Sequence, residues 1–218
     1  NNHESSEMVS RPTSSTVRIK ARTGPYVALT PVLVGVFIAA DDQTVVVTVL
    51  PQIMLDMRVA VTELDRVSWT ITGYLLGYLV AMPLIGRLSD VWGHRRLFIG
   101  SLLSFMAGSV AVALAPSLEW LIAARVFQAV GAGALVPISI AIAGDLFPPG
   151  HRGLALGLIG ASAEGGGVIG PLWGGLITRF LDWRWVFWIN LPLAVVVLVL
   201  VVWLLKPSPR FPARVDYL

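Results

Sequence analysis

Residues 185–205 read WVFWINLPLAVVVLVLVVWLL, a run without a single charged side chain. A helix of about 20 apolar residues is long enough to cross the hydrocarbon core of a bilayer. The rest of the chain has the same character, because 56% of its 218 residues are hydrophobic and only 13% are charged. Soluble domains carry about 25% charged residues. The composition therefore indicates a lipid solvent and argues against a cytosolic enzyme, a nucleic-acid binder or a disordered chain.

Six apolar runs of this length follow one another, and we expect each to form a helix across the membrane. They lie near 27–50, 67–87, 96–115, 117–144, 152–178 and 185–205. The sequence thus predicts an all-α membrane protein, with a six-transmembrane-helix bundle over 26–205. The intervening stretch 51–66 looks helical and is expected to cap the outer mouth. We expect a disordered cytoplasmic tail over 1–25 and a cytoplasmic linker over 206–218 that leads to a missing second half.

The basic residues are distributed unequally between the two sides of such a bundle. Eleven of the 16 Lys and Arg residues fall in the terminal segments and in the second and fourth connections between spans, whereas four fall on the other side. An excess of this kind marks the cytoplasmic side. We therefore expect a multi-pass protein of the cell membrane with both termini of this chain in the cytoplasm.

The sequence offers little for an enzyme. It contains no Cys, and its three His residues (His3, His94 and His151) lie outside the apolar runs. No Ser-His pair, metal-ligand spacing or phosphate-binding loop is present in the sequence. We therefore expect no enzymatic activity, no cofactor and no metal site.

Four ionisable residues interrupt the apolar runs: Asp41, Asp42, Arg125 and Glu164. Each would cost several kcal/mol if it faced lipid, so each is expected to face an interior cavity or a partner. Asp41 and Asp42 lie about 100° apart on a helix and cannot share one direction. One interpretation is a carboxylate that carries a proton beside an arginine, and the other is a fixed ion pair between helices. Intramembrane carboxylates usually mark proton or ion paths, which favours the first.

Small residues recur in the run 152–178. Glycines spaced three or four apart allow helix backbones to approach closely, and Pro171 is expected to kink the helix. The line comprises Gly157, Gly160, Glu164, Gly167, Gly170 and Gly174. Close packing is the plain interpretation, and a bent helix that shapes and seals a transport pocket is the functional one.

A second pattern combines aromatic, Met and amide side chains. Tyr74, Tyr78 and Met82 step by four along one helix face, and Gln128 lies one turn after Arg125. A packing stripe is the commoner meaning of such spacing. Aromatic and Met surfaces also suit a pocket for varied apolar ligands, so these residues are candidates for a substrate cavity.

Five segments carry a resemblance to a known family. Residues 86–96 (GRLSDVWGHRR), 125–133 (RVFQAVGAG) and 166–175 (GGVIGPLWGG) resemble the loop, span-four and span-five signatures of the major facilitator superfamily. The stretch from Asp42 to Pro51 and the segment 182–192 (DWRWVFWINLP) resemble its fourteen-span drug:proton antiporter branch, the EmrB/QacA type. Their order along the chain makes the combined match specific.

The resemblance implies one half of a major facilitator fold that works by alternating access. It implies that Asp42 is the protonation site, Arg125 its partner and Glu164 a second acidic site. The gating loop is expected to use Gly86, Arg87, Asp90, Gly93, Arg95 and Arg96, and the antiporter motif Gly166, Gly170, Pro171, Gly174 and Gly175. His94 stands where the family usually has Arg, so we expect Asp90 to pair with Arg87, Arg95 or Arg96.

The sequence thus predicts a proton-coupled exporter of lipophilic drugs. Its partners would be lipophilic small molecules or lipids, protons, the bilayer and the missing C-terminal bundle, with no nucleic acid. A lipid exporter is an alternative, because Glu164 and the segment 74–78 (YLLGY) are similar to mycobacterial lipid exporters. A non-transporting membrane half-module is another alternative. A proton-coupled importer fits the span-five antiporter signature poorly.

Overall fold

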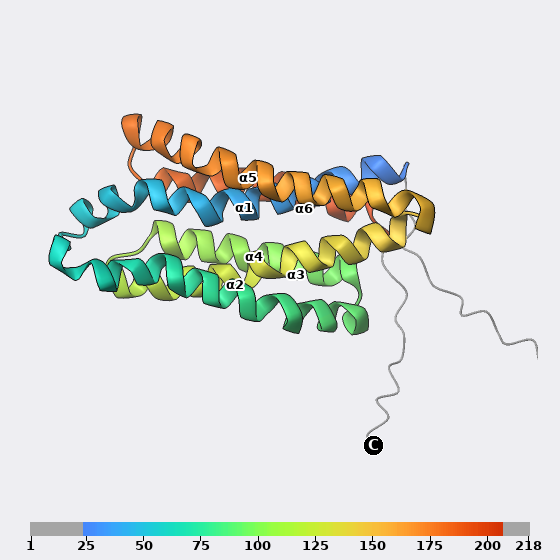
Figure 1. The fold of residues 1–218 in the computed structure, drawn as a ribbon, viewed down its shortest axis with the longest axis horizontal. Helices are drawn as coiled ribbons and strands as arrows, with labels where there is room; N and C mark the ends of the chain where they lie inside the picture. The colour runs from blue at the N-terminus through green and yellow to red at the C-terminus, as the bar shows by residue number, and fades with distance from the viewer. Residues whose placement is uncertain (1–23, 207–218) are drawn as a thin grey trace, which may run out of the picture.

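Six long helices run back and forth along one axis in the computed structural model, which describes residues 24–206 (Figure 1). They are α1 (Pro25–Asp56), α2 (Leu64–Trp92), α3 (His94–Ala113), α4 (Leu118–Leu146), α5 (Arg152–Phe180) and α6 (Arg184–Leu204). Each is long and apolar enough to cross a membrane, which confirms the predicted all-α bundle of six spans. The predicted tail and linker fall almost entirely on residues 1–23 and 207–218, outside the described residues.

The helices form two layers, with α1, α5 and α6 in one and α2, α3 and α4 in the other (Figure 1). Helix α1 packs mainly on α5, and α4 packs on α2 and α3. Contacts of α4 with α1, and of α3 with α6, join the layers. The start of α1 and the end of α6 lie at one end of the bundle, here called the terminal end (Figure 1). The opposite end, which holds the α1–α2, α3–α4 and α5–α6 connections, is called the distal end.

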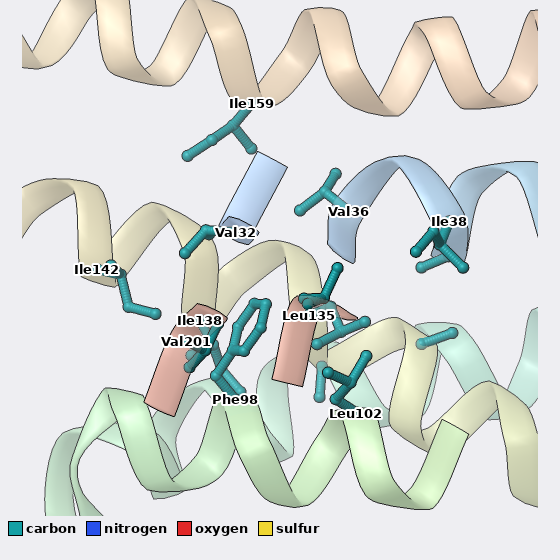
Figure 2. Packing of buried hydrophobic residues seen from close by; sticks show 14 of the residues in the cluster. Val32, Val36, Ile38, Phe98, Leu102, Leu135, Ile138, Ile142, Ile159 and Val201 are labelled. Atoms are coloured by element: carbon teal, nitrogen blue, oxygen red, sulfur yellow. The ribbon is translucent and has the colours of Figure 1, made fainter. Parts of the chain in front are cut away.

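The apolar core consists of two clusters that follow one another along the bundle axis. The cluster nearer the terminal end includes Val32, Phe98 and Ile138, whose side chains meet between the helices (Figure 2). The cluster nearer the distal end includes Val46 and Phe187. On α1, α3, α4 and α6 the residues between the two clusters include buried polar side chains. A polar layer therefore divides the core.

Close approach between α1 and α5 depends on three glycines one helical turn apart. A Cβ atom at Gly170 would lie 2.7 Å from the Asp41 carbonyl oxygen, and one at Gly174 would lie 2.6 Å from Val45 Cγ2. Gly166 meets the α1 backbone in the same way. Helix α5 continues through Pro171 to Phe180.

The predicted single line of small residues along α5 was wrong in its first half. Gly157 and Gly160 are exposed, and a Cβ atom there would meet nothing within 4 Å. Steps of four back from Gly166 lead to Ser162 and Leu158, so the two earlier glycines lie off the stripe that contacts α1.

Two connections differ from expectation. The predicted turn over 86–96 is mostly helix, because α2 runs to Trp92 and α3 begins at His94. The break is the single residue Gly93, whose φ of 92° lies in a region that favours glycine. The segment 51–66, expected to be a helical cap, is divided among three elements: α1 extends through Pro51 to Asp56, a short 3-10 turn covers Val61–Glu63, and α2 begins at Leu64.

Candidate proton-coupling site

The polar layer is centred on an ion pair between α1 and α4. Arg125 Nη1 donates to Asp42 Oδ2 at 2.6 Å and to Gln128 Oε1 at 2.8 Å. Arg125 Nη2 also lies 3.4 Å from the Asp42 carbonyl oxygen. Arg125 and Gln128 face the same side of α4 because three residues separate them, about one helical turn. The structure thus brings together the two residues expected to form the proton-coupling pair.

Amide groups from two helices complete the shell around Asp42. Gln128 Nε2 and Asn190 Nδ2 each donate to Asp42 Oδ1 at 2.9 Å. Gln128 Nε2 also lies 2.8 Å from Ser109 Oγ on α3. The carboxylate of Asp42 therefore receives hydrogen bonds from α4 and α6, and the network ties four of the six helices to one group.

The network is closed to solvent. Asp42 and Gln128 are 0% exposed and Arg125 is 1% exposed. The Tyr74 ring of α2 covers the guanidinium, with Arg125 Cζ 3.9 Å from the ring centre, and Phe187 lies at 5.8 Å on α6. A cation held over a ring face in a desolvated site gains further attraction. These contacts keep the arginine inside an apolar bundle in spite of its desolvation.

The arrangement has a clear chemical capability. When Asp42 is ionised, its charge balances that of Arg125, and both Nη atoms of the arginine have hydrogen-bond acceptors, although its buried Nε has none. A buried pair is tolerated where the opposite charge and most of the hydrogen bonds are in place. When Asp42 takes up a proton, Arg125 loses its counter-ion and the network must rearrange. The state of one proton is thereby linked to the packing of α1, α4 and α6.

The side chains of the other two intramembrane acids make no hydrogen bond to this network among residues 24–206. Asp41 is 7% exposed and lines a pocket of about 140 Å³ between α1, α5 and α6. Glu164 is on the exposed face of α5. None of the hydrogen bonds or ion pairs seen in 24–206 involves the Glu164 side chain.

The residues predicted for the gating loop lie at the terminal end. His94 Nδ1 lies 2.7 Å from Asp145 Oδ2 of α4, and His94 Nε2 lies 3.3 Å from Asp90 Oδ1. The partner observed for Asp90 is thus His94, where we expected an arginine, because the short break at Gly93 places His94 one turn after Asp90. Arg95 Nη2 donates to the Val202 carbonyl of α6 at 3.0 Å. Gly86, Arg87 and Arg96 lie on the same stretch, with Arg87 and Arg96 exposed.

The residues predicted for a substrate cavity are divided in the structure. Tyr74 and Gln128 belong to the closed polar network, whereas Tyr78 and Met82 are only half-buried. A separate groove of about 440 Å³ lies between α2 and α4 on the surface of the bundle. Its lining is wholly apolar: Trp69, Gly73, Leu76, Gly77, Val80, Ala81, Leu84, Ile85, Val126 and Val130.

Two members of the network were not predicted as site residues. Asn190 is the one polar side chain in the run 185–205, and a lone amide in an apolar span is a signal that would have identified it. Ser109 gave no such signal, because serine is common at helix–helix contacts in membranes.

Comparison with known proteins supports the fold and the family. The Major Facilitator Superfamily model matches residues 32–216. Triacylglyceride transporters of Mycolicibacterium hassiacum and Mycobacterium tuberculosis are each 43% identical to the chain, over 89% of its length. The chain spans only 37% and 39% of the length of these two relatives.

Solved structures of low sequence similarity share the fold. A D-xylose-proton symporter superposes with a TM-score of 0.74 at 16% identity, covering 86% of this chain and 49% of the symporter. A bacterial homologue of the human lysosomal transporter Spinster gives 0.72 at 20% identity, covering 88% and 45%. From the six spans, the signature segments and the family match together, the chain belongs to the major facilitator superfamily.

Proposed function

We propose that the chain forms one of two bundles in a proton-coupled secondary transporter that exports lipidic molecules. The observation that carries the proposal is the buried Asp42–Arg125 pair, closed by Gln128 and Asn190 at the middle of the bundle. An ion pair that only holds helices together does not need to lie at the middle of the bundle. Ionisable residues inside a membrane usually mark ion or proton paths.

The proposed cycle follows from the charge balance. Protonation of Asp42 removes the counter-ion of Arg125 and changes the relative free energies of the two access states. Coupling requires that proton and substrate each bind the two states with different affinity. Glu164 is proposed as a second acidic site, because its exposed position on α5 faces away from this bundle. Gly166, Gly170, Pro171, Gly174 and Gly175 of α5 are proposed to keep α5 fixed on α1 during the cycle.

Two observations favour lipids over drugs as the substrate class. The close relatives are named triacylglyceride transporters. The groove on α2 and α4 is lined only by apolar residues and extends from Trp69 to Ile85, a rise of about 24 Å along the helix. The hydrocarbon of one bilayer leaflet is about 15 Å thick. The groove is therefore long enough for an acyl chain and offers no polar partner for a charged drug.

We further propose that the protein lies in the cell membrane and that the terminal end of the bundle faces the cytoplasm. In the sequence, the terminal segments and the stretches around the α2–α3 and α4–α5 connections together hold eleven Lys and Arg residues, whereas those around the distal connections hold four. The gating residues of the α2–α3 break would then lie at the cytoplasmic mouth, where Asp90, His94 and Asp145 connect α2, α3 and α4.

The test uses the complete protein encoded by the reading frame that contains this sequence, reconstituted in proteoliposomes. An imposed pH gradient is expected to drive export of a fluorescent triacylglyceride, and Asp42→Asn is expected to abolish the gradient-driven part. Unchanged transport by Asp42→Asn would refute the assignment. Glu119→Gln, at an exposed position of the distal end, is the matched acid-to-amide control.

A second arm of the experiment separates the alternatives. Gradient-driven export of lipophilic cations without export of triacylglyceride would assign the protein to drug efflux. A reading frame that stops at residue 218, with no gradient-driven flux of either compound, would favour a non-transporting half-module.

A further inference from the structure

The two neighbouring acids of α1 lie in opposite environments. Asp42 receives hydrogen bonds from Arg125, Gln128 and Asn190. Asp41 is only 7% exposed, yet its carboxyl group makes no hydrogen bond or ion pair with any other residue of 24–206. A buried ionised carboxylate without a partner is costly, so such a group persists only if it binds something or becomes neutral.

The surroundings of Asp41 form a small pocket rather than packed side chains. The pocket measures about 140 Å³ and opens where α5 and α6, which contact each other little, leave α1 uncovered. Its walls are Phe37, Ile38, Ile169, Trp173 and Leu193, and its polar groups are Asp41 and Asn190. Asp41 and Asn190 give the pocket the polar partners that a bound water molecule needs. Water that enters the pocket can thus bring a proton to Asp41, whereas the volume is far too small for a whole lipid molecule.

The charged and titratable groups around this part of α1 are few. Asp42 is adjacent on α1 itself, and Arg125 from α4 is engaged with Asp42. Helix α2 contributes Tyr74 on the Arg125 side, and α6 contributes the amide of Asn190. Helix α5 places Gly166 and Gly170 against the α1 backbone, while its Glu164 is exposed. No cation among the described residues neutralises Asp41.

Asn190 connects the two acids. Its Nδ2 donates to Asp42 Oδ1, and the same residue lines the Asp41 pocket. We propose that this pocket is a second proton-binding site, with Asp41 as the group that binds the proton and Asn190 as the link to the Asp42–Arg125 pair. The use of this site in transport rests on the proposed function, whereas proton binding at Asp41 does not.

The site is tested by infrared difference spectroscopy of the purified complete protein during steps in pH. A protonated carboxyl group gives a C=O stretching band that is absent from the carboxylate. Asp41→Asn is expected to remove one component of this band, Asp41→Glu to restore it at a shifted frequency, and Asp42→Asn to leave it in place. A difference spectrum of Asp41→Asn that superimposes on that of the wild type would overturn the proposal.

Further controls separate proton binding at Asp41 from a structural role and from the binding of a metal cation. Asp41→Leu suits the apolar walls of the pocket, and failure of both the Asn and the Leu variant to fold would assign Asp41 a structural role and overturn the proposal. A band that responds to replacement of K⁺ by Na⁺ but not to pH would also overturn it. If the wild type shows no gradient-driven export while the Asp41 band titrates, the proposed function fails and the proton site stands.

Discussion

The polar network at the middle of the bundle and the ion pairs at its distal end use the same residue types in opposite surroundings. In the network, Asp42 and Arg125 are almost completely buried. At the distal end, Arg66 pairs with Glu63 and Glu119, and all three side chains are exposed. Exposed pairs are screened by water and contribute little, whereas breaking a buried pair leaves an uncompensated charge. The position of an ion pair along the bundle therefore decides how much its loss destabilises the fold.

The largest effect expected from this comparison is that of Arg125→Leu. Removal of the cation leaves Asp42 buried without a counter-ion, which costs roughly 3–5 kcal/mol. The midpoint of thermal unfolding in detergent is expected to fall, and gradient-driven export to be lost. The double variant Asp42→Leu/Arg125→Met removes both charges and leaves only the neutral polar groups of the layer, so its stability should exceed that of Arg125→Leu while export stays absent. A double variant less stable than the single one would contradict the charge argument.

The next effect is that of Asn190→Leu, which sharpens the comparison inside the network. The change removes one donor from Asp42 Oδ1 but leaves the ion pair intact. A hydrogen bond to a charged group contributes about 1.5–3 kcal/mol, so the loss of stability should be smaller than for Arg125→Leu. Unfolding midpoints in detergent measure the difference. Leu193→Ala, a change of one side chain on the same helix outside the network, is the packing control.

A third prediction concerns the close packing of α5 on α1, which involves no charged side chain. Gly170→Ala places a methyl group against the Asp41 carbonyl oxygen of α1, and overpacking of this kind costs typically 1–3 kcal/mol. The matched control is Gly160→Ala on the same helix, where a Cβ atom meets nothing within 4 Å. It should leave stability unchanged or raise it, because alanine favours a helix more than glycine does. Equal destabilisation by both variants would contradict the α1–α5 packing.

The smallest effect is expected at the distal end itself. Glu119→Gln removes one partner of Arg66, but the arginine keeps Glu63 at 2.7 Å and stays in contact with solvent. Unfolding midpoints and export are therefore expected to match the wild type within error. A loss comparable to that of Asn190→Leu would break the distinction between the buried and the exposed charges.

Much of the fold was predictable from the sequence, because hydropathy alone locates helices that cross the hydrocarbon core of a membrane. The six expected spans correspond to α1–α6 with shifts of a few residues at most ends. The errors occurred where polar residues continue a helix beyond the apolar run. The segment GRLSDVWGHRR was expected to be a turn, but local helix geometry persists up to Gly93 and resumes at His94.

The candidate site was predictable only in part. Asp42 and Arg125 stood out as charges in apolar runs, and the structure pairs them. Which of the two neighbouring acids would meet Arg125 depends on the rotation of α1, which packing against α4 and α5 sets. Hydropathy contains no information about that rotation, and the choice of Asp42 rested on the family resemblance alone. The roles of Asn190 and Ser109 likewise depend on which helix faces meet. Asn190 lies 148 residues from its partner Asp42, and Ser109 lies 19 residues from its partner Gln128.

The spacing of the network along the chain constrains how the protein is made. Asp42 precedes Arg125 by 83 residues and Asn190 by 148. At about 5–20 residues per second, a ribosome needs roughly 4 to 17 s to add the first of these partners after Asp42 has been synthesised. During that interval Asp42 lacks its partner Arg125, so its carboxyl group stays beside water or becomes neutral by taking up a proton. The ion pair can form only after the fourth span has been made.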